Sequence, residues 1–166
     1  MPMRRLVFFV VALFALLGPV LAGAAKPANK YLWATVNLCD TAGAPDTIGI
    51  RASMPGNGTR QQLYMRFEAQ RFDAANHRYV PSGSSSRWIR VGSARFKSAQ
   101  AGFSFQFGLQ PGTEATFRGL VDFEWRARRN GRQVVVRQEA RITRAGIEGV
   151  GGGDPPNTSA ATCVIR

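Results

Sequence analysis

The chain has 166 residues, a formal net charge of +12 and 45% hydrophobic residues, with 18 Gly, 9 Pro and 2 Cys. Its length suits a single domain. The apolar fraction excludes an intrinsically disordered chain, and the Gly and Pro content is too low and too aperiodic for collagen, so we expect a folded globular core.

The N-terminal segment has the features of a secretory signal peptide in their usual order. Two arginines precede an apolar run over residues 6–17, and small residues follow at 22–25. The run of about 12 residues is shorter than the roughly 20 that a membrane-spanning helix needs. We therefore expect a cleavable N-terminal signal helix over residues 1–25, and a secreted domain over residues 26–166 with no membrane span after cleavage.

Apolar and polar residues alternate with a period of two through the mature chain, and no segment has amphipathic helical spacing. The row Leu63, Met65, Phe67 and Ala69 is typical of one buried strand face. Residues rich in Pro, Gly and Ser separate the alternating runs, and the predicted loops include 81–86 and 149–156. The predicted strands, in chain order, are 31–38, 47–52, 62–72, 87–91, 94–97, 102–107, 116–128, 133–144 and 162–165.

The dipeptide Asn130-Gly131 predicts a tight hairpin between the two longest runs. Both central residues of a type I′ turn need positive φ, and Asn-Gly tolerates it best. A slip of one residue would turn charged side chains inward, so the apolar pattern favours one register. The predicted buried pairs are Ala127 with Val134, Trp125 with Val136, Phe123 with Gln138, and Val121 with Ala140.

Cys39 and Cys163 are the only cysteines. An even number of cysteines in an exported protein predicts a disulfide, and two cysteines allow one connectivity. The bond would tie the first predicted strand to the last, closing a loop on the order of 125 residues, for which the chain-entropy model gives about 5 kcal/mol of stabilisation. A reactive free thiol is the alternative, but no neighbouring His or Lys would lower its pKa.

The succession of short strands and turns predicts an all-β fold, a two-sheet antiparallel β-sandwich. The long hairpin from Phe117 to Thr143 with Trp125, and the strand spacing across residues 31–165, resemble the immunoglobulin-like and fibronectin type III-like superfamily. This resemblance implies an exported β-sandwich module. The cysteines lie at the terminal strands, whereas the immunoglobulin pattern places them across mid-chain strands around a core Trp. The chain also looks like small secreted proteins of high-GC bacteria, which implies no activity.

Few residues offer catalytic chemistry. His77 is the only histidine, and we interpret it as an exposed loop residue; we expect no metal site and no cofactor. Asp122 and Glu124 share a strand face about 6.6 Å apart, a spacing that glycosidases use, so a small secreted hydrolase is the alternative function. A cross-strand ion-pair ladder with Arg137 and Arg141 explains the two carboxylates without a cleft. We therefore predict that the protein is not an enzyme.

Basic residues concentrate on the outward face and the tip of the predicted hairpin. Outside a cell they would attract wall polyphosphates, acidic glycans or lipid headgroups with salt-sensitive affinity, although charge for solubility alone is the competing interpretation. We predict a secreted non-catalytic module with a binding or structural role at the cell surface. Its expected partner is an anionic cell-envelope polymer or another surface protein, not a specific nucleic acid. A third hypothesis is a subunit whose partner covers an open sheet edge. The predicted anion-binding residues are Arg126, Arg128, Arg129, Arg132, Arg137 and Arg141.

Overall fold

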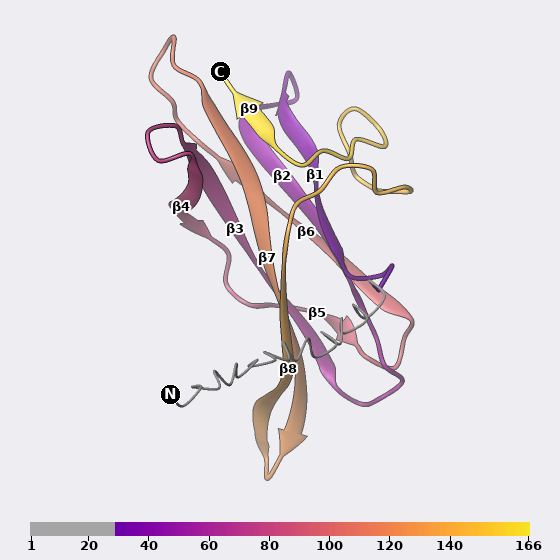
Figure 1. Cartoon of the computed structure of the whole chain (residues 1–166). Helices are drawn as coiled ribbons and strands as arrows, with labels where there is room; N and C mark the ends of the chain where they lie inside the picture. The colour runs from indigo at the N-terminus through magenta and orange to yellow at the C-terminus, as the bar shows by residue number, and fades with distance from the viewer. Residues whose placement is uncertain (1–28) are drawn as a thin grey trace, which may run out of the picture.

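The computed structural model describes residues 29–166, and all regular structure in that range is β-strand (Figure 1). The predicted signal segment, residues 1–25, lies outside the described residues. Across 29–166 there is no helix long and apolar enough to cross a membrane. The strands are β1 (Trp33–Thr41), β2 (Ala44–Pro55), β3 (Gln62–Asp73), β4 (Arg78–Ser85), β5 (Ile89–Ser93), β6 (Ser98–Gln106), β7 (Ala115–Arg129), β8 (Arg132–Ile142) and β9 (Cys163–Ile165).

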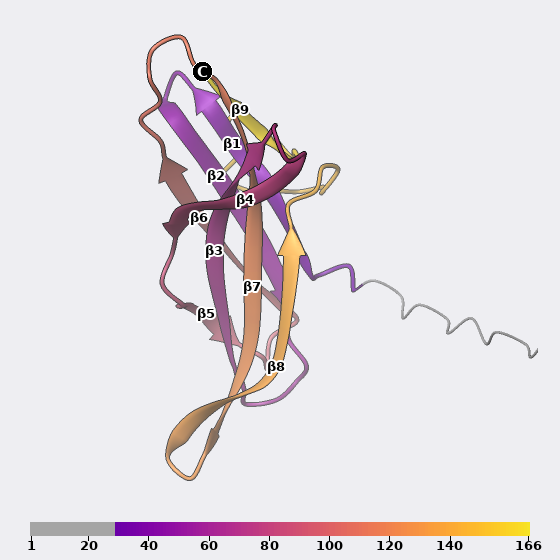
Figure 2. The ribbon, with the colours of Figure 1, turned by 60° about the vertical axis from the view of Figure 1, so that its left-hand side comes forward.

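The strands form two antiparallel sheets, as the alternation predicted. One sheet has three strands in the order β1-β2-β6. The other has the order β4-β3-β7-β8, and β5 and β9 pair with β3 and β7 respectively. Figure 2 shows the two layers, with β8 at the margin of the larger sheet. The two sheets give the chain a β-sandwich-like architecture.

The core lies between the sheets and is built from the inward row of each strand. The predicted row of β3, Leu63, Met65, Phe67 and Ala69, is fully buried. Its neighbours come from β7 and from β2 of the other sheet, and they include Phe117, Val121, Phe123, Trp125, Ile48, Ile50 and Met54. The sheets approach so closely that a Cβ at Gly119 would lie 2.7 Å from the Ile50 side chain, which explains a glycine in the middle of β7.

The predicted disulfide is present and joins the two sheets. Cys39 of β1 is bonded to Cys163 of β9, with the Cα atoms 5.3 Å apart. β1 belongs to the three-stranded sheet and β9 to the larger one. Cys163 is buried in the core cluster, and Cys39 packs against that cluster. The bond therefore connects the two layers near both ends of the described chain.

Two local predictions were wrong. Residues 81–86 were expected to form a flexible loop, but residues 81–85 belong to β4. Serine side chains hold this strand: Ser82 Oγ donates to the Ala69 carbonyl, and the Phe67 amide donates to Ser86 Oγ. Residues 94–97 were expected to be a strand and instead form the turn between β5 and β6, where the Ala94 carbonyl accepts the amides of Asn57 and Gly58 in the β2–β3 connection.

The β7–β8 hairpin confirms the predicted turn but corrects the register. Asn130 and Gly131 both have positive φ, at 49° and 78°. The predicted pairing of Ala127 with Val134 is present, but a β-bulge follows, so that Trp125 faces Arg137 and Val136 has no partner. Beyond the bulge the remaining predicted pairs are wrong by one residue: Phe123 faces Glu139 and Val121 faces Arg141. β8 is mostly exposed and contributes no residue to the apolar core cluster, so burial of apolar side chains does not fix which face of β8 turns inward.

Candidate functional site

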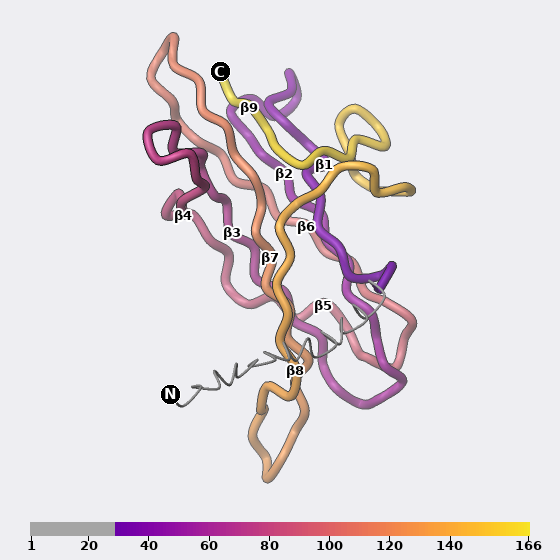
Figure 3. Tube along the Cα trace, viewed as in Figure 1, coloured from indigo at the N-terminus to yellow at the C-terminus, as the bar shows by residue number. Residues whose placement is uncertain are grey.

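The tip of the β7–β8 hairpin projects beyond the rest of the molecule, as Figure 3 shows. Its positive-φ turn brings the ends of the two strands together, with Arg129 directly opposite Arg132. Arg128, Arg129 and Arg132 are all exposed. None of the three forms an ion pair with a described carboxylate. Three guanidinium groups are therefore free to contact an external anion.

The other three predicted anion-binding residues lie further from the tip and are paired within the protein. Arg126 Nε lies 2.6 Å from Glu124 Oε2. Arg137 and Arg141 both bind Glu139, at 2.8 and 3.0 Å. The hydrogen bond from Arg137 lowers the pKa of the Glu139 carboxyl, and Arg141 lowers it further. The six predicted arginines thus divide into three free residues at the tip and three that are paired with two carboxylates, Glu124 and Glu139.

The predicted ladder of Asp122 and Glu124 with arginines of β8 is wrong. Asp122 instead pairs with Arg66 of β3 at 2.8 Å, and Glu124 pairs with Arg126 of its own strand. Arg66 lies directly opposite Asp122 in the β3–β7 register, whereas the bulge turns Arg137 to the other face of the sheet. Both carboxylates accept guanidinium hydrogen bonds, an arrangement that supports a structural role for them.

Arginines and aromatic rings stack on the outward face of the larger sheet, a feature that the sequence analysis missed. Arg126 lies over the rings of Tyr64 and Trp88, at 4.1 and 5.1 Å from their centroids. Arg66 also lies over Trp88 at 5.3 Å, and further along the same face Arg118 lies over Tyr79 at 4.1 Å. The alternation of β3 places Tyr64 and Arg66 outward, but their contacts depend on neighbours far away in the sequence.

This stacked face leads into the hairpin tip. Arg126 and Arg128 occupy successive outward positions of β7, and Arg128 lies opposite Gln133. The hydroxyl of Tyr64 donates to Gln133 Oε1 at 3.1 Å, which ties the stacked aromatic to the base of the tip. The tip and the adjoining Tyr64–Trp88–Arg126 stack together form the candidate site, which we call the arginine hairpin face.

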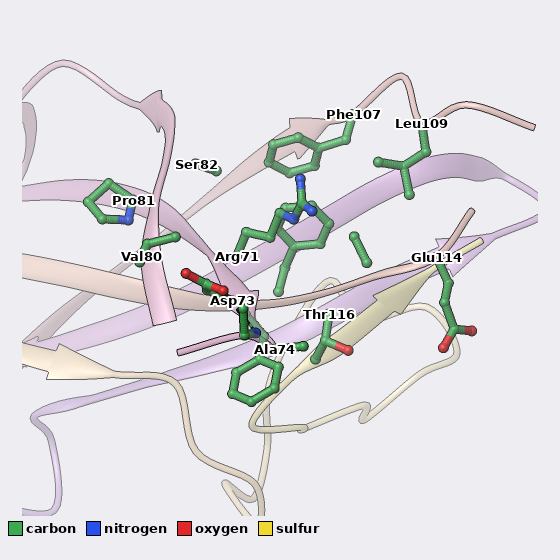
Figure 4. A pocket seen from close by; sticks show the side chains of 14 residues that line it. Arg71, Asp73, Ala74, Val80, Pro81, Ser82, Phe107, Leu109, Glu114 and Thr116 are labelled. Atoms are coloured by element: carbon green, nitrogen blue, oxygen red, sulfur yellow. Dashed lines mark hydrogen bonds between the residues drawn. The ribbon is translucent and has the colours of Figure 1, made fainter. Parts of the chain in front are cut away.

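A separate cleft of about 840 Å³ lies at the opposite end of the sheets (Figure 4). Its apolar wall includes Phe107 and Phe117, whose rings stack with centroids 4.2 Å apart. Arg71, which continues the inward row of β3, is exposed in the cleft. Asp73 at its rim is held by Asn76, whose side-chain hydrogen bond lowers the pKa of the Asp73 carboxyl. Neither Asp122 nor Glu124 lines this cleft.

His77 and the metal-ligating residue types form no site in the described part of the chain. His77 is exposed in the β3–β4 turn with φ of 48°, in agreement with its interpretation as a surface loop residue. Within residues 29–166, no three His, Cys, Asp or Glu side chains gather where they could hold a metal ion.

Comparisons with protein-family models, curated proteins and solved structures found no match. The geometry and charge of the arginine hairpin face are therefore what indicates a function.

Proposed function

We propose that this protein is an exported, non-catalytic β-sandwich module of immunoglobulin-like type that binds anionic polymers through the arginine hairpin face. The observation that carries the proposal is the projecting hairpin tip, where Arg128, Arg129 and Arg132 are exposed and have no carboxylate partner among the described residues. The signal-like segment over residues 1–25 and the disulfide support a location outside the cell, because such bonds persist in oxidising compartments.

The chemistry of guanidinium groups defines the class of ligand. Arginine presents a planar fork of donors that matches phosphate, sulfate and carboxylate groups, and it keeps its charge at all physiological pH values. Three free arginines at one tip would favour a polymer with repeated charges over a single small anion. The stacked rings of Tyr64 and Trp88 with Arg126 add flat surfaces beside the tip. Polyphosphates and acidic glycans of the cell envelope fit this description.

The test compares two variants that lose the same charge from opposite ends of the larger sheet. The first carries R128Q, R129Q and R132Q at the tip. The control carries R71Q, R78Q and R166Q, three exposed residues near the other end. Binding to long-chain inorganic polyphosphate and to a sulfated glycan is measured between about 50 and 200 mM salt. In this range each phosphate contact makes the logarithm of the binding constant fall by roughly 0.7–0.9 per unit of the logarithm of the salt concentration.

We expect the tip variant to bind at least about tenfold more weakly at low salt, with a salt slope smaller by roughly 2 if three contacts are lost. The control variant should lose much less affinity for the polymer, because its substituted arginines lie far from the tip. Equal losses in the two variants would show that net charge alone attracts the polymer. Retention of full affinity by the tip variant would contradict the proposed site.

A further inference from the structure

The outer edge of β8 is unpaired in the described structure. β8 ends its sheet, and among the described residues its strand partner is β7 on the other side. The Thr143 amide donates to the Gly119 carbonyl of β7. Because backbone groups of an edge strand alternate in direction, those of Arg141, Glu139 and Arg137 also point to β7, and those of Gln138, Ala140 and Ile142 point away.

One side-chain contact supports this assignment. The Ala140 carbonyl accepts a hydrogen bond from Nη1 of Arg141, the next residue of the same strand, at 2.6 Å. A carbonyl within the ladder to β7 would instead accept a backbone amide. The open edge then ends at Arg144, whose amide donates to the Ala34 carbonyl of β1. The free stretch therefore has Ala140 near its middle.

The side chains along this stretch form two different rows. Arg137, Glu139 and Arg141 lie on the face that carries Trp125, and they form the two ion pairs that share Glu139. Gln138, Ala140 and Ile142 lie on the opposite face, where Ile142 is 50% exposed. An exposed edge of this length is a template for another strand, and charged residues on an edge usually oppose such pairing unless they meet opposite charges.

We propose that β8 pairs with β8 of a second copy of this chain, antiparallel and with Ala140 at the two-fold axis. In this register Ala140 faces Ala140, Gln138 faces Ile142, and Glu139 faces Arg141 of the second copy. The two Glu139 side chains are thus each placed opposite an arginine. The three pairs whose backbone groups point outward would exchange about six hydrogen bonds.

The neighbouring registers are less favourable. A two-fold axis at Glu139 would place the two Glu139 carboxylates opposite each other and Arg137 opposite Arg141 of the second copy, so like charges would meet. An axis at Gln138 would bring Val136, the unpaired bulge residue, into the new ladder. Charge and the bulge together select the register at Ala140.

The pairing also has a consequence that rests on the proposed function. In an antiparallel pair the two hairpin tips point in opposite directions, and each turn lies nine residues from the axis. At 3.4 Å per residue the tips would be about 60 Å apart. A dimer of this kind could engage one long polymer at two points, and the second contact would gain from the high effective concentration of the linked site.

A cysteine at the axis tests the register directly. In the proposed dimer the two Ala140 Cα atoms form a hydrogen-bonded pair about 5.5 Å apart, within the range for a disulfide. We expect A140C to form covalent dimers under mild oxidation. The control A74C places a thiol on an exposed alanine of the β3–β4 turn and should form few. Equal cross-linking of the two variants would overturn the register.

Charge reversal tests the ion pairs in solution. Light scattering after size exclusion should give a concentration-dependent dimer for the wild type. E139R places an arginine opposite Arg141 of the second copy, so like charges meet, and it should shift the midpoint concentration of dimerisation upward by about tenfold or more. E139R/R141E restores opposite charges at these two positions and should recover the dimer. Circular dichroism verifies folding of each variant.

A proline gives a second, independent readout. The Ala140 amide points away from β7, so A140P should leave the β7–β8 ladder intact while removing a central donor of the new one. We expect a folded monomer. A wild type that stays monomeric at millimolar concentration, or an A140P variant that still dimerises, would overturn the proposal. Polymer binding by a monomer would leave the proposed function standing, so the two failures are distinguishable.

Discussion

At the scale of single residues, Trp125 is the side chain on which the centre of the core most depends. It is fully buried on β7, and its indole N–H donates to the Pro55 carbonyl at the end of β2, at 2.9 Å. The hydrogen bond thus links the two sheets. We expect W125F to lower the free energy of unfolding by about 2–4 kcal/mol, since it leaves that carbonyl without its partner and creates a void.

Urea denaturation measures the effect of W125F, and W88F is the matched control. Trp88 is half-buried on the outward face, where Arg66 and Arg126 lie over its ring. W88F should lower the free energy of unfolding by about 1 kcal/mol or less, because a phenyl ring still offers a face to the guanidinium groups. Equal costs at the two positions would contradict the role given to the indole hydrogen bond.

Individual side chains also show where sequence reasoning succeeds. The inward row of β3 could be predicted because a period of two depends on the strand alone, and all four of its predicted residues are buried. The partner of Asp122 could not be predicted in the same way. Arg66 lies opposite it only because β3 and β7 are in one register, and no short turn connects those strands to fix that register.

At the scale of elements, the β7–β8 turn depends on Gly131, whose φ of 78° is strained for any residue with a Cβ. We expect G131A to destabilise the tip by about 1–2 kcal/mol, and to speed hydrogen exchange of the amides beside the turn. The control G108A lies at a position without positive φ and with open space around the new Cβ, so it should exchange like the wild type. Unchanged exchange in G131A would contradict the importance of the turn.

The same hairpin shows why an element can be predicted while its register is not. The turn residues carry a local conformational requirement, so Asn130-Gly131 identified the hairpin from sequence. The bulge beside Trp125 has no comparable signal, because β8 is mostly exposed and its run of three valines fits either face. For this reason the split of the predicted arginines into free and paired groups emerges only from the folded structure.

At the scale of the whole molecule, the Cys39–Cys163 bond limits how far the two sheets can separate. β9 is only three residues long and pairs only with the start of β7, so its backbone hydrogen bonds alone hold it weakly. The bond adds a covalent link from β9 to β1 across a sequence separation of 124 residues. A long closed loop restricts the unfolded chain most, and removal of such a bond typically costs about 2–5 kcal/mol.

We therefore expect C39A/C163A to unfold at a lower urea concentration and to show early exchange at the Ile165 amide, which faces β7, because β9 detaches before the larger β3–β7 core. The wild type in reductant should also unfold at a lower urea concentration, and it lacks only the covalent link because it keeps both sulfur atoms in the core. If the midpoint of the oxidised wild type equalled that of the variant, the bond would add nothing to stability. The sheets would then be held by core packing alone, between rows such as Ile48 and Ile50 on β2 and Phe67 on β3.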